Sequence, residues 1–535
     1  MGRRRPQAAP AAAVAGSCQL ASPERGHAGV LRRRPARRPP RRIPCARRRS
    51  RLRHPGPEGL SVPTNTETTA EATVAILPAL AGRISAYRIE DLDDHARRLV
   101  RTAFTDTLGV ALAGSGFAGI TAIRTAAGIA ASENGSLVLG TAERVPALDA
   151  GLLNGVAAHA LDFDDGNSAL GGHPSAMLVP ALLALGEETG ASAPDVAVAY
   201  AAGYEVMIRL AYGLNPAHYQ RGWHPTSTIG VIGIAAAAAR LLRLSAERTA
   251  IAMAVAVSHA AGVKANFGTM TKSLHVGQAV RNGILAAKLA AAGYTANPGA
   301  LEHRQGFLAV YNGHGDFDSG RIVAGLSGPP LACSEHNPIK LYACCHSTHG
   351  AIEAAREIRR SPGFDAGRVE AVEITVDPNR LPHTDRPVLT EALSGKFSLQ
   401  YVTSRALLTG TVALADFDGD AHHDPATLAL MSRVRVMPAA PGGRSNSFTA
   451  TVRIRQFDGT VFTATRGPHG SESDTPVDPS LLRQKFTDCA GRVLPADRVT
   501  ALSEALLQFP DTGTTVRELM RLAEVHRPTE ARVTP

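Results

Sequence analysis

Apolar residues recur at helical spacing over much of the first two thirds of the chain. Between residues 89 and 114, Leu99, Phe104 and Leu108 fall on one stripe, acidic residues lie near the start of the stretch, and Gly114 marks its end. Similar Ala-rich blocks follow, and we predict helices at 148–160, 175–188, 191–213, 226–243, 246–262 and 276–292. Because Ala and Gly allow helix axes to approach closely, this region predicts a dense all-α bundle.

The pattern changes after about Pro338. Residues 369–377 alternate like a strand, and residues 448–467 form two β-rich runs around Asp458 and Gly459, a strong hairpin signal. Helical periodicity returns at 478–486 and 496–507. We therefore predict a mainly α protein with a large helical domain at 76–337, a smaller α/β domain at 338–475, and C-terminal helices at 476–527 that pack back on the helical domain.

The net charge of +10 is concentrated at the N-terminus. Residues 1–60 carry sixteen Arg against only Glu24 and Glu58, so the remainder of the chain is mildly acidic. A basic nucleic-acid footprint across the folded part is therefore not supported. We predict that residues 1–75, rich in Arg and Pro, are disordered. Three interpretations of this segment compete: a start site placed too far upstream, a non-conserved tail, and an acidic-poor transit-like or nucleic-acid-binding arm.

The cysteines and apolar runs bear on location. The six cysteines have no metal-ligand spacing, which favours a reducing compartment: Cys18, Cys45, Cys333, Cys344, Cys345 and Cys489. Apolar runs such as 229–239 are well short of the ~18 residues that a membrane-spanning helix needs. We expect a soluble, cytoplasmic protein without membrane contact.

The stretch at 159–174, HALDFDDGNSALGGHP, is the first candidate for chemistry. It joins two imidazoles, His159 and His173, with three carboxylates, Asp162, Asp164 and Asp165. Carboxylates beside imidazoles shift each other's pKa values, as acid–base catalysis near neutral pH requires. The structural alternative is that the acidic residues solvate a loop and cap the next helix.

Four further motifs carry candidate residues. His224 in GWHPTST (222–228) precedes a helix start, where the helix dipole favours the neutral, basic imidazole. Lys272 and His275 in the 266–283 stretch lie three apart and would form an anion-receptive helix face. Lys340 lies in KLYACCHSTHG (340–350) at the predicted domain boundary, and Tyr401 ends GKFSLQY (395–401). The structural alternatives are a helix boundary, a solvated surface helix, small core cysteines and a buried tyrosine.

A further motif, LEHRQGFLAVY (301–311), lies between the 266–283 stretch and KLYACCHSTHG. Taken in their order along the chain, all these motifs resemble the MmgE/PrpD family, and the resemblance runs from about residue 80 to 525. The family includes 2-methylcitrate dehydratase, cis-aconitate decarboxylase and iminodisuccinate epimerase. The resemblance implies a large helical domain completed by C-terminal helices, with a smaller α/β lid inserted before them. It also implies a homodimer.

The resemblance further implies roles for single residues. Asp162 and His173 would flank the reacting carbons, His224 would be a second acid–base imidazole, and Lys272 would bind a substrate carboxylate. Lys340 and Tyr401 would belong to the lid residues that complete the pocket. The chain departs from the family pattern at Gly166, where several members have Thr, and at Cys345, where the animal decarboxylase has His.

We predict a lyase that acts on a small di- or tricarboxylate, by dehydration or decarboxylation, without a cofactor or metal. Proton transfer next to a carboxylate needs cations at the anion and a nearby acid or base. We expect Asp162, His173, His224 and Tyr401 to be catalytic, and Lys272, His275 and Lys340 to bind the substrate. The alternatives are an epimerase, a metal-dependent hydrolase that uses the His and Asp residues of 159–173, and a non-enzymatic nucleic-acid-associated protein that uses the Arg-rich arm.

Overall fold

Two hydrophobic cores organise the structure, a computed structural model that describes residues 75–440, 448–467 and 478–525. The larger core gathers side chains from residues 76–332 and 486–523, so the C-terminal segment shares the core of the helices before it. The smaller core lies mainly within residues 342–464. The domain boundaries given above remain predictions, and the predicted disordered arm lies outside the described residues apart from its last position.

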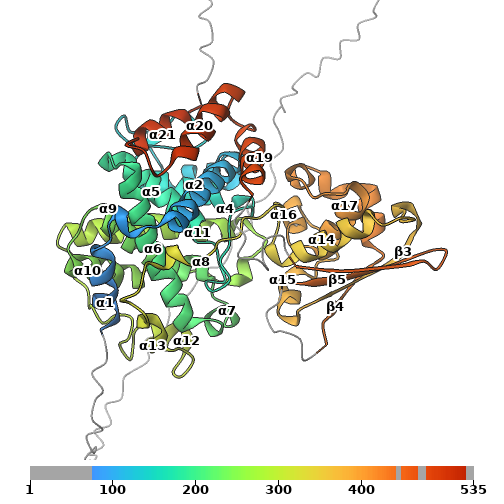
Figure 1. Ribbon diagram of the computed structural model, residues 1–535, viewed down its shortest axis with the longest axis horizontal. Coiled ribbons are helices and arrows are strands. Elements are labelled where there is room, and N and C mark those ends of the chain that lie inside the picture. The colour runs from blue at the N-terminus through green and yellow to red at the C-terminus, as the bar shows by residue number, and fades with distance from the viewer. Residues whose placement is uncertain (1–74, 441–447, 468–477, 526–535) are drawn as a thin grey trace, which may run out of the picture. The chain divides into compact units, whose positions relative to one another are not determined.

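The larger core is built almost entirely from α-helices, which confirms the mainly α prediction. The helices up to residue 323 are α1 (Ile76–Ser85), α2 (Asp94–Gly114), α3 (Ala118–Ala127), α4 (Ala147–Ala160), α5 (Ser175–Thr189), α6 (Ala193–Leu214), α7 (Ala217–Gln220), α8 (Pro225–Thr228), α9 (Gly230–Leu241), α10 (Ala246–Val257), α11 (Met270–Ala291), α12 (Phe307–Asn312) and α13 (Ser319–Val323). The C-terminal helices are α19 (Pro479–Ala490), α20 (Ala496–Gln508) and α21 (Val516–Leu522). Figure 1 shows them beside α2 and α5, which they contact. A two-stranded antiparallel ribbon pairs β1 (Ser136–Leu137) with β2 (Arg144–Val145).

Glycines bring α4 and α11 unusually close together. A Cβ added at Gly277 would lie 2.4 Å from the carbonyl oxygen of Leu152, and one added at Gly155 would lie 3.1 Å from the Cα of Gly277. The two helices run antiparallel here, since residues earlier in α4 meet residues later in α11. The end of α4, which leads to Asp162, therefore lies beside the start of α11, which carries Lys272.

The predicted helix ends were wrong at two places that border the site. The helix predicted at 276–292 begins at Met270, because the Thr269 side chain caps it by accepting a hydrogen bond from the Thr271 N–H. This places Lys272 in the first helical turn. The helix predicted at 246–262 ends at Val257, and the chain passes through Gly262 at a φ of 122°, a conformation that favours glycine.

The smaller core lies under a four-stranded sheet of order β4-β3-β5-β6. The strands are β3 (Val369–Val376), β4 (Val434–Pro438), β5 (Ala450–Gln456) and β6 (Val461–Arg466), and the helices are α14 (His346–Arg359), α15 (Leu381–Thr384), α16 (Ala392–Gly395), α17 (Leu399–Thr409) and α18 (Pro425–Met431). β3 pairs parallel with β4 and antiparallel with β5. The predicted strand and hairpin are confirmed, with Gly459 in the turn at a φ of 87°. Helices α14 and α17 cover one face of the sheet (Figure 1).

Within the described ranges, no single helix is long and apolar enough to cross a membrane. The bent pair of α2 and α3 meets the length and composition test only when the two helices are taken together.

Candidate active site

The chain turns sharply after α4 at Asp162. Its φ of 50° lies in the left-handed region, which Asp tolerates better than most residues but which still costs free energy. Lys340 holds this turn, because its ammonium group donates to the carbonyl oxygen and to Oδ1 of Asp162, each at 2.8 Å. Lys272 donates to the same Oδ1 at 2.7 Å. One carboxylate thus joins α4, α11 and the segment before α14.

The Asp162 cluster is buried and carries a net positive charge. Burial by itself would raise the pKa of Asp162, but Lys272 and Lys340 oppose it and bring the pKa well below its ordinary value. Burial would lower the pKa of Lys340, yet Asp162 raises it. The carboxylate therefore stays ionised between two ammonium groups, and the surplus cation attracts an anion.

His159 and His173 share a second buried carboxylate, Asp164. The Asp164 Oδ2 lies 2.8 Å from His159 Nδ1 and 3.2 Å from His173 Nδ1. Burial lowers the pKa of His159 to about 4 although Asp164 opposes that shift, so His159 is neutral. His173 Nδ1 lies 2.6 Å from the carbonyl oxygen of Asp165. Because a carbonyl only accepts hydrogen bonds, Nδ1 of His173 carries a proton and its Nε2 remains for a substrate.

His224 provides a further neutral imidazole. It precedes Pro225, the first residue of α8, and is buried. Burial and then the nearby His159 and Lys272 bring the pKa of His224 well below its ordinary value. Its Nδ1 lies 3.2 Å from Nδ1 of His275, so these two histidines hydrogen-bond to each other.

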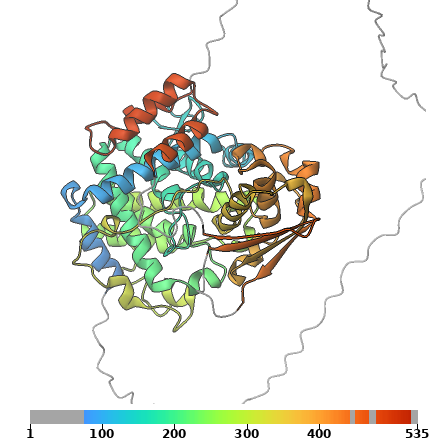
Figure 2. The same ribbon diagram turned by 45° about the vertical axis from the view of Figure 1, so that its right-hand side comes forward.

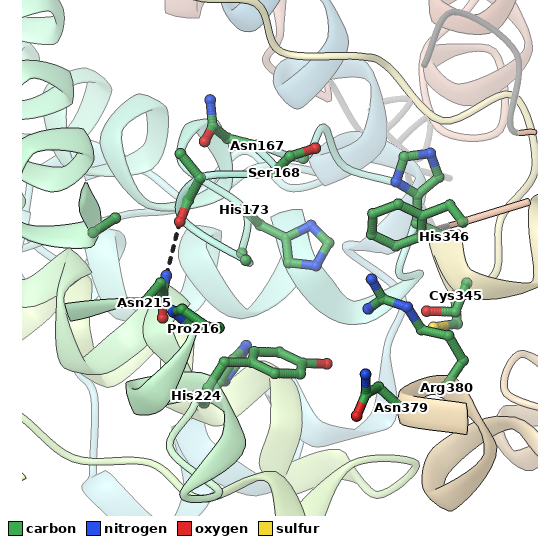
Figure 3. A pocket seen from close by; sticks show the side chains of 18 of the residues that line it. Asn167, Ser168, His173, Asn215, Pro216, His224, Cys345, His346, Asn379 and Arg380 are labelled. Carbon is green, nitrogen blue, oxygen red and sulfur yellow. Dashed lines mark hydrogen bonds between the residues drawn. The ribbon is translucent and has the colours of Figure 1, made fainter. Parts of the chain in front are cut away.

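These groups border a cavity of about 540 Å³, large enough for a small polycarboxylate. Asp162, His173, His224, Lys272 and Lys340 all line it. Figure 3 shows His173 and Asn167 on one side of the cavity and Cys345, His346 and Arg380 on another. The turned view of the fold (Figure 2) shows the sheet and its helices beside the larger group of helices. Helical and α/β segments therefore both contribute to one cavity.

Sequence reasoning missed Arg380 and His383. Arg380 ends the short 3-10 helix Pro378–Arg380 directly after β3, is buried, and stacks over the Phe448 ring at 4.0 Å. His383 also lines the cavity, and burial followed by Arg380 lowers its pKa to about 3. The sequence signal that could have identified Arg380 and His383 was the polar run after the predicted strand at 369–377, because ligand sites often lie at the carboxyl ends of strands.

His346 was noted in its motif but not chosen as a site residue. It begins α14 and lines the cavity. Burial, followed by His349 and Lys340, brings the pKa of His346 well below its ordinary value. It is therefore a neutral hydrogen-bonding group on the cavity wall.

Sequence profiles of two domains match the chain. The profile of the MmgE/PrpD N-terminal domain matches residues 78–319, and that of the MmgE/PrpD C-terminal domain matches residues 342–508. Together they cover more than half of the chain. The protein belongs to the MmgE/PrpD family.

The MmgE/PrpD relatives of this chain include several decarboxylases. It is 28% identical to a cis-aconitate decarboxylase of Mus musculus over 450 residues, which cover 82% of this chain and 91% of the relative. It is also 28% identical to a cis-aconitate decarboxylase of Homo sapiens over 448 residues, with 82% and 92% covered. A cis-aconitate decarboxylase of Aspergillus terreus (strain NIH 2624 / FGSC A1156) is 27% identical over 412 residues, with 72% and 83% covered.

Two predicted residues of the MmgE/PrpD site lie away from the cavity. Tyr401 is buried in the smaller core, where its hydroxyl donates to the carbonyl oxygen of Asp416, and burial raises its pKa to about 12. His275 contacts His224 but lines a separate cavity of about 290 Å³. The i, i+3 spacing placed Lys272 and His275 on one helix face, but the two side chains reach different cavities.

The donor set argues against a divalent metal ion. His159, Asp162 and His173 have ligand atoms within 4.8 Å of one another, which is close enough for a metal site. However, Oδ1 of Asp162 already accepts from the ammonium groups of Lys272 and Lys340. A divalent cation at this carboxylate would be repelled by both lysines, so these residues do not fit a metal.

Proposed function

We propose that this protein is a lyase that decarboxylates a small polycarboxylate, with cis-aconitate as the first candidate. The observation that carries the proposal is the buried Asp162 carboxylate held between Lys272 and Lys340 at the wall of a cavity lined by His173 and His224. The similarity to the cis-aconitate decarboxylases of mouse and human supports the reaction class.

Lys272 and Lys340 would bind the carboxylate next to the reacting carbons. Two lysines face one aspartate, so one positive charge is left over for a substrate anion. Charge-assisted hydrogen bonds in a buried site are stronger than neutral ones. When the bond to CO2 breaks, the electron pair that remains is delocalised towards this carboxylate. Its negative charge therefore grows in the transition state, where fixed cations stabilise it.

His173 would deliver the proton that completes the reaction. The carbon–carbon bond to CO2 breaks, and a carbon–hydrogen bond forms with the proton from Nε2 of His173. Asp164, at 3.2 Å from Nδ1 of His173, stabilises the cationic ring before this transfer. His173 regains a proton from solvent, so each turnover consumes one proton. His224, neutral and on a different element, would hydrogen-bond to the substrate and orient it.

The test is a substrate panel with product analysis. The full chain is incubated separately with cis-aconitate, citrate, 2-methylcitrate and iminodisuccinate, and CO2 release and organic products are followed by mass spectrometry and chiral separation. We expect CO2 and an unsaturated dicarboxylate from cis-aconitate, and no activity in Asp162→Asn. Loss of water from citrate or 2-methylcitrate without CO2 would assign dehydration instead. Inversion of iminodisuccinate would assign epimerisation.

A further inference from the structure

Two histidines lie between the active-site cavity and the second cavity of about 290 Å³. His224 lines the active-site cavity (Figure 3), and His275 lines the second one. The Nδ1 atoms of the two rings are 3.2 Å apart, and the ring centres are 5.4 Å apart. The two imidazoles therefore form a hydrogen-bonded connection from one cavity to the other.

Gly262 fixes these two rings relative to each other. Its carbonyl oxygen accepts a hydrogen bond from the backbone N–H of His224 at 3.1 Å. A Cβ added at Gly262 would lie 3.2 Å from Cγ and 3.3 Å from Nδ1 of His275, so the backbone packs directly against that ring. The contact between the two imidazoles is therefore built into the fold and does not depend on a flexible side chain.

One proton is shared between the two Nδ1 atoms. Burial, followed by His159 and Lys272, brings the pKa of His224 well below its ordinary value, and burial, followed by Lys272, lowers the pKa of His275. Both rings are neutral, and a neutral imidazole has one nitrogen that donates and one that accepts. When Nδ1 of His275 carries the shared proton, Nε2 of His224 carries a proton that it can donate. When Nδ1 of His224 carries it, Nε2 of His224 can only accept.

The second cavity gives the far side of His275 access to solvent. Its wall includes Val263, which is 41% exposed, and Gln278, which is also exposed. Its volume of about 290 Å³ has room for several water molecules, and Asn282 and His259 are polar residues of the wall. Water in this cavity can exchange a proton with His275 without entering the active-site cavity.

We propose that His275 is a positioning residue that relays protons between the second cavity and His224. The inference rests on the proposed function for the substrate atom that His224 contacts, which is an oxygen of the carboxylate whose charge grows as CO2 leaves. An O–H bond forms there while the N–H bond at Nε2 of His224 breaks. Nδ1 of His224 takes the shared proton from His275, and Nε2 of His275 takes a proton from solvent. These protons return by the same path once His173 has protonated the carbon, so each turnover still consumes one proton.

Chemical rescue of His275→Ala in the full chain tests the relay. This substitution should lower kcat for CO2 release from cis-aconitate about 10- to 100-fold. Added 4-methylimidazole, which is the histidine side chain as a free molecule, should raise kcat of the variant at least about fivefold. 1-Methylimidazole has the same size but cannot take up a proton at one nitrogen while it gives one from the other, so it should not rescue. Equal rescue by the two molecules would show that the ring only fills space and would overturn the relay.

Two further variants separate a relay from a fixed hydrogen bond. His275→Gln keeps a group that can hydrogen-bond to His224 but cannot pass a proton on, so kcat should fall about as far as in His275→Ala. Wild-type kcat in His275→Gln would also overturn the relay. The matched control is His259→Gln, because His259 lines the same cavity and has no contact with His224 among the described residues. This control should keep kcat within about twofold.

A measurement without substrate keeps the relay testable apart from the proposed reaction. ¹⁵N NMR of the histidine-labelled chain reports the tautomer of His224, with its signals assigned by comparison with His224→Gln. We expect the tautomer populations of His224 to change in His275→Ala and to stay unchanged in His259→Gln. Unchanged populations in His275→Ala would overturn the coupling. If the wild type dehydrates or epimerises a substrate instead of releasing CO2, the proposed reaction fails, and the same rescue comparison on that reaction decides the relay.

Discussion

The substitution Lys272→Met tests the charge arrangement at the centre of the site. Methionine keeps most of the side-chain length and removes the ammonium group that lies 2.7 Å from Asp162 Oδ1. Breaking a buried ion pair by removing one partner costs about 3–5 kcal/mol. Here Lys340 still donates to the same oxygen at 2.8 Å, so we expect the free energy of unfolding to fall by less, about 1–3 kcal/mol.

The effect of Lys272→Met on catalysis should be larger than its effect on stability. Losing one desolvated cation from a carboxylate costs about 2–4 kcal/mol, which corresponds to a fall in kcat/KM of roughly 30- to 900-fold. Part of the loss should appear in kcat, because charge on that carboxylate grows in the transition state. The assay is steady-state CO2 release from cis-aconitate, with urea denaturation for stability.

Acid unfolding gives a second readout of the same substitution. The folded pKa of Asp162 is well below its unfolded value near ~4, so its contribution to stability is present above that value and is lost as the pH falls through the folded pKa. Removing Lys272 raises the folded pKa and shrinks the contribution. The acid-unfolding midpoint of Lys272→Met should therefore lie at a higher pH than that of the wild type.

A matched control lies on the same helix. Lys288 of α11 forms an ion pair with Glu188 at 2.6 Å, and both side chains are about one third exposed. Such a surface pair contributes only about 0–1 kcal/mol, so Lys288→Met should be nearly neutral in stability and activity. The reasoning is refuted if kcat/KM of Lys272→Met stays within threefold of the wild type. It is also refuted if Lys272→Met lowers the free energy of unfolding equally in the wild-type and Asp162→Asn backgrounds.

Three further predictions concern individual side chains. In His173→Gln the glutamine side chain cannot transfer a proton near neutral pH, so kcat should fall about 10²- to 10⁴-fold while the melting temperature stays near normal. Near-normal turnover with a large loss of stability would instead show that His173 is a structural residue. Tyr401→Phe should keep kcat/KM within twofold and lower stability by about 1 kcal/mol, because its hydrogen bond to the Asp416 carbonyl is lost; a tenfold fall in kcat in kinetic assays would return Tyr401 to the site. The melting temperature measured by calorimetry should fall from pH 7 to pH 5. The folded pKa values of His224 and His383 lie below the unfolded value of about 6.5, so the stability that these two neutral imidazoles contribute is lost as the pH drops below 6.5. Asp165, with a folded pKa raised to about 7, works in the opposite sense between pH 4 and 7, so a melting temperature that stays constant or rises would show that the buried histidines do not dominate.

Local signals in the sequence were enough to predict the elements that carry the site. The Asp458–Gly459 turn predicted the hairpin of β5 and β6, and Gly114 was correctly identified as the end of the helix α2. These features depend on residues that are neighbours in the chain, so no distant contact is needed to predict them. The same holds for the concentration of His and Asp residues between His159 and His173, which marked the loop as a site.

Contacts between distant residues were decided only by the tertiary structure. Asp162 meets Lys272 across 110 residues and Lys340 across 178 residues, and the sequence gives neither distance nor direction. Two candidates show the limit clearly. His275 lies one helical turn from Lys272 yet lines another cavity, and Tyr401 points into the smaller core. Which side of a helix meets a cavity depends on how neighbouring helices pack around it.

The sequence by itself therefore determined the helical and strand pattern, the family, and the residue types that suit carboxylate chemistry. The tertiary structure decided which of those residues share a cavity, and it added Arg380, whose position depends on the turn after β3 and on stacking against Phe448. The physical reason is that periodicity and capping act over a few residues. Charge pairing and burial depend instead on distances between segments that only packing brings together.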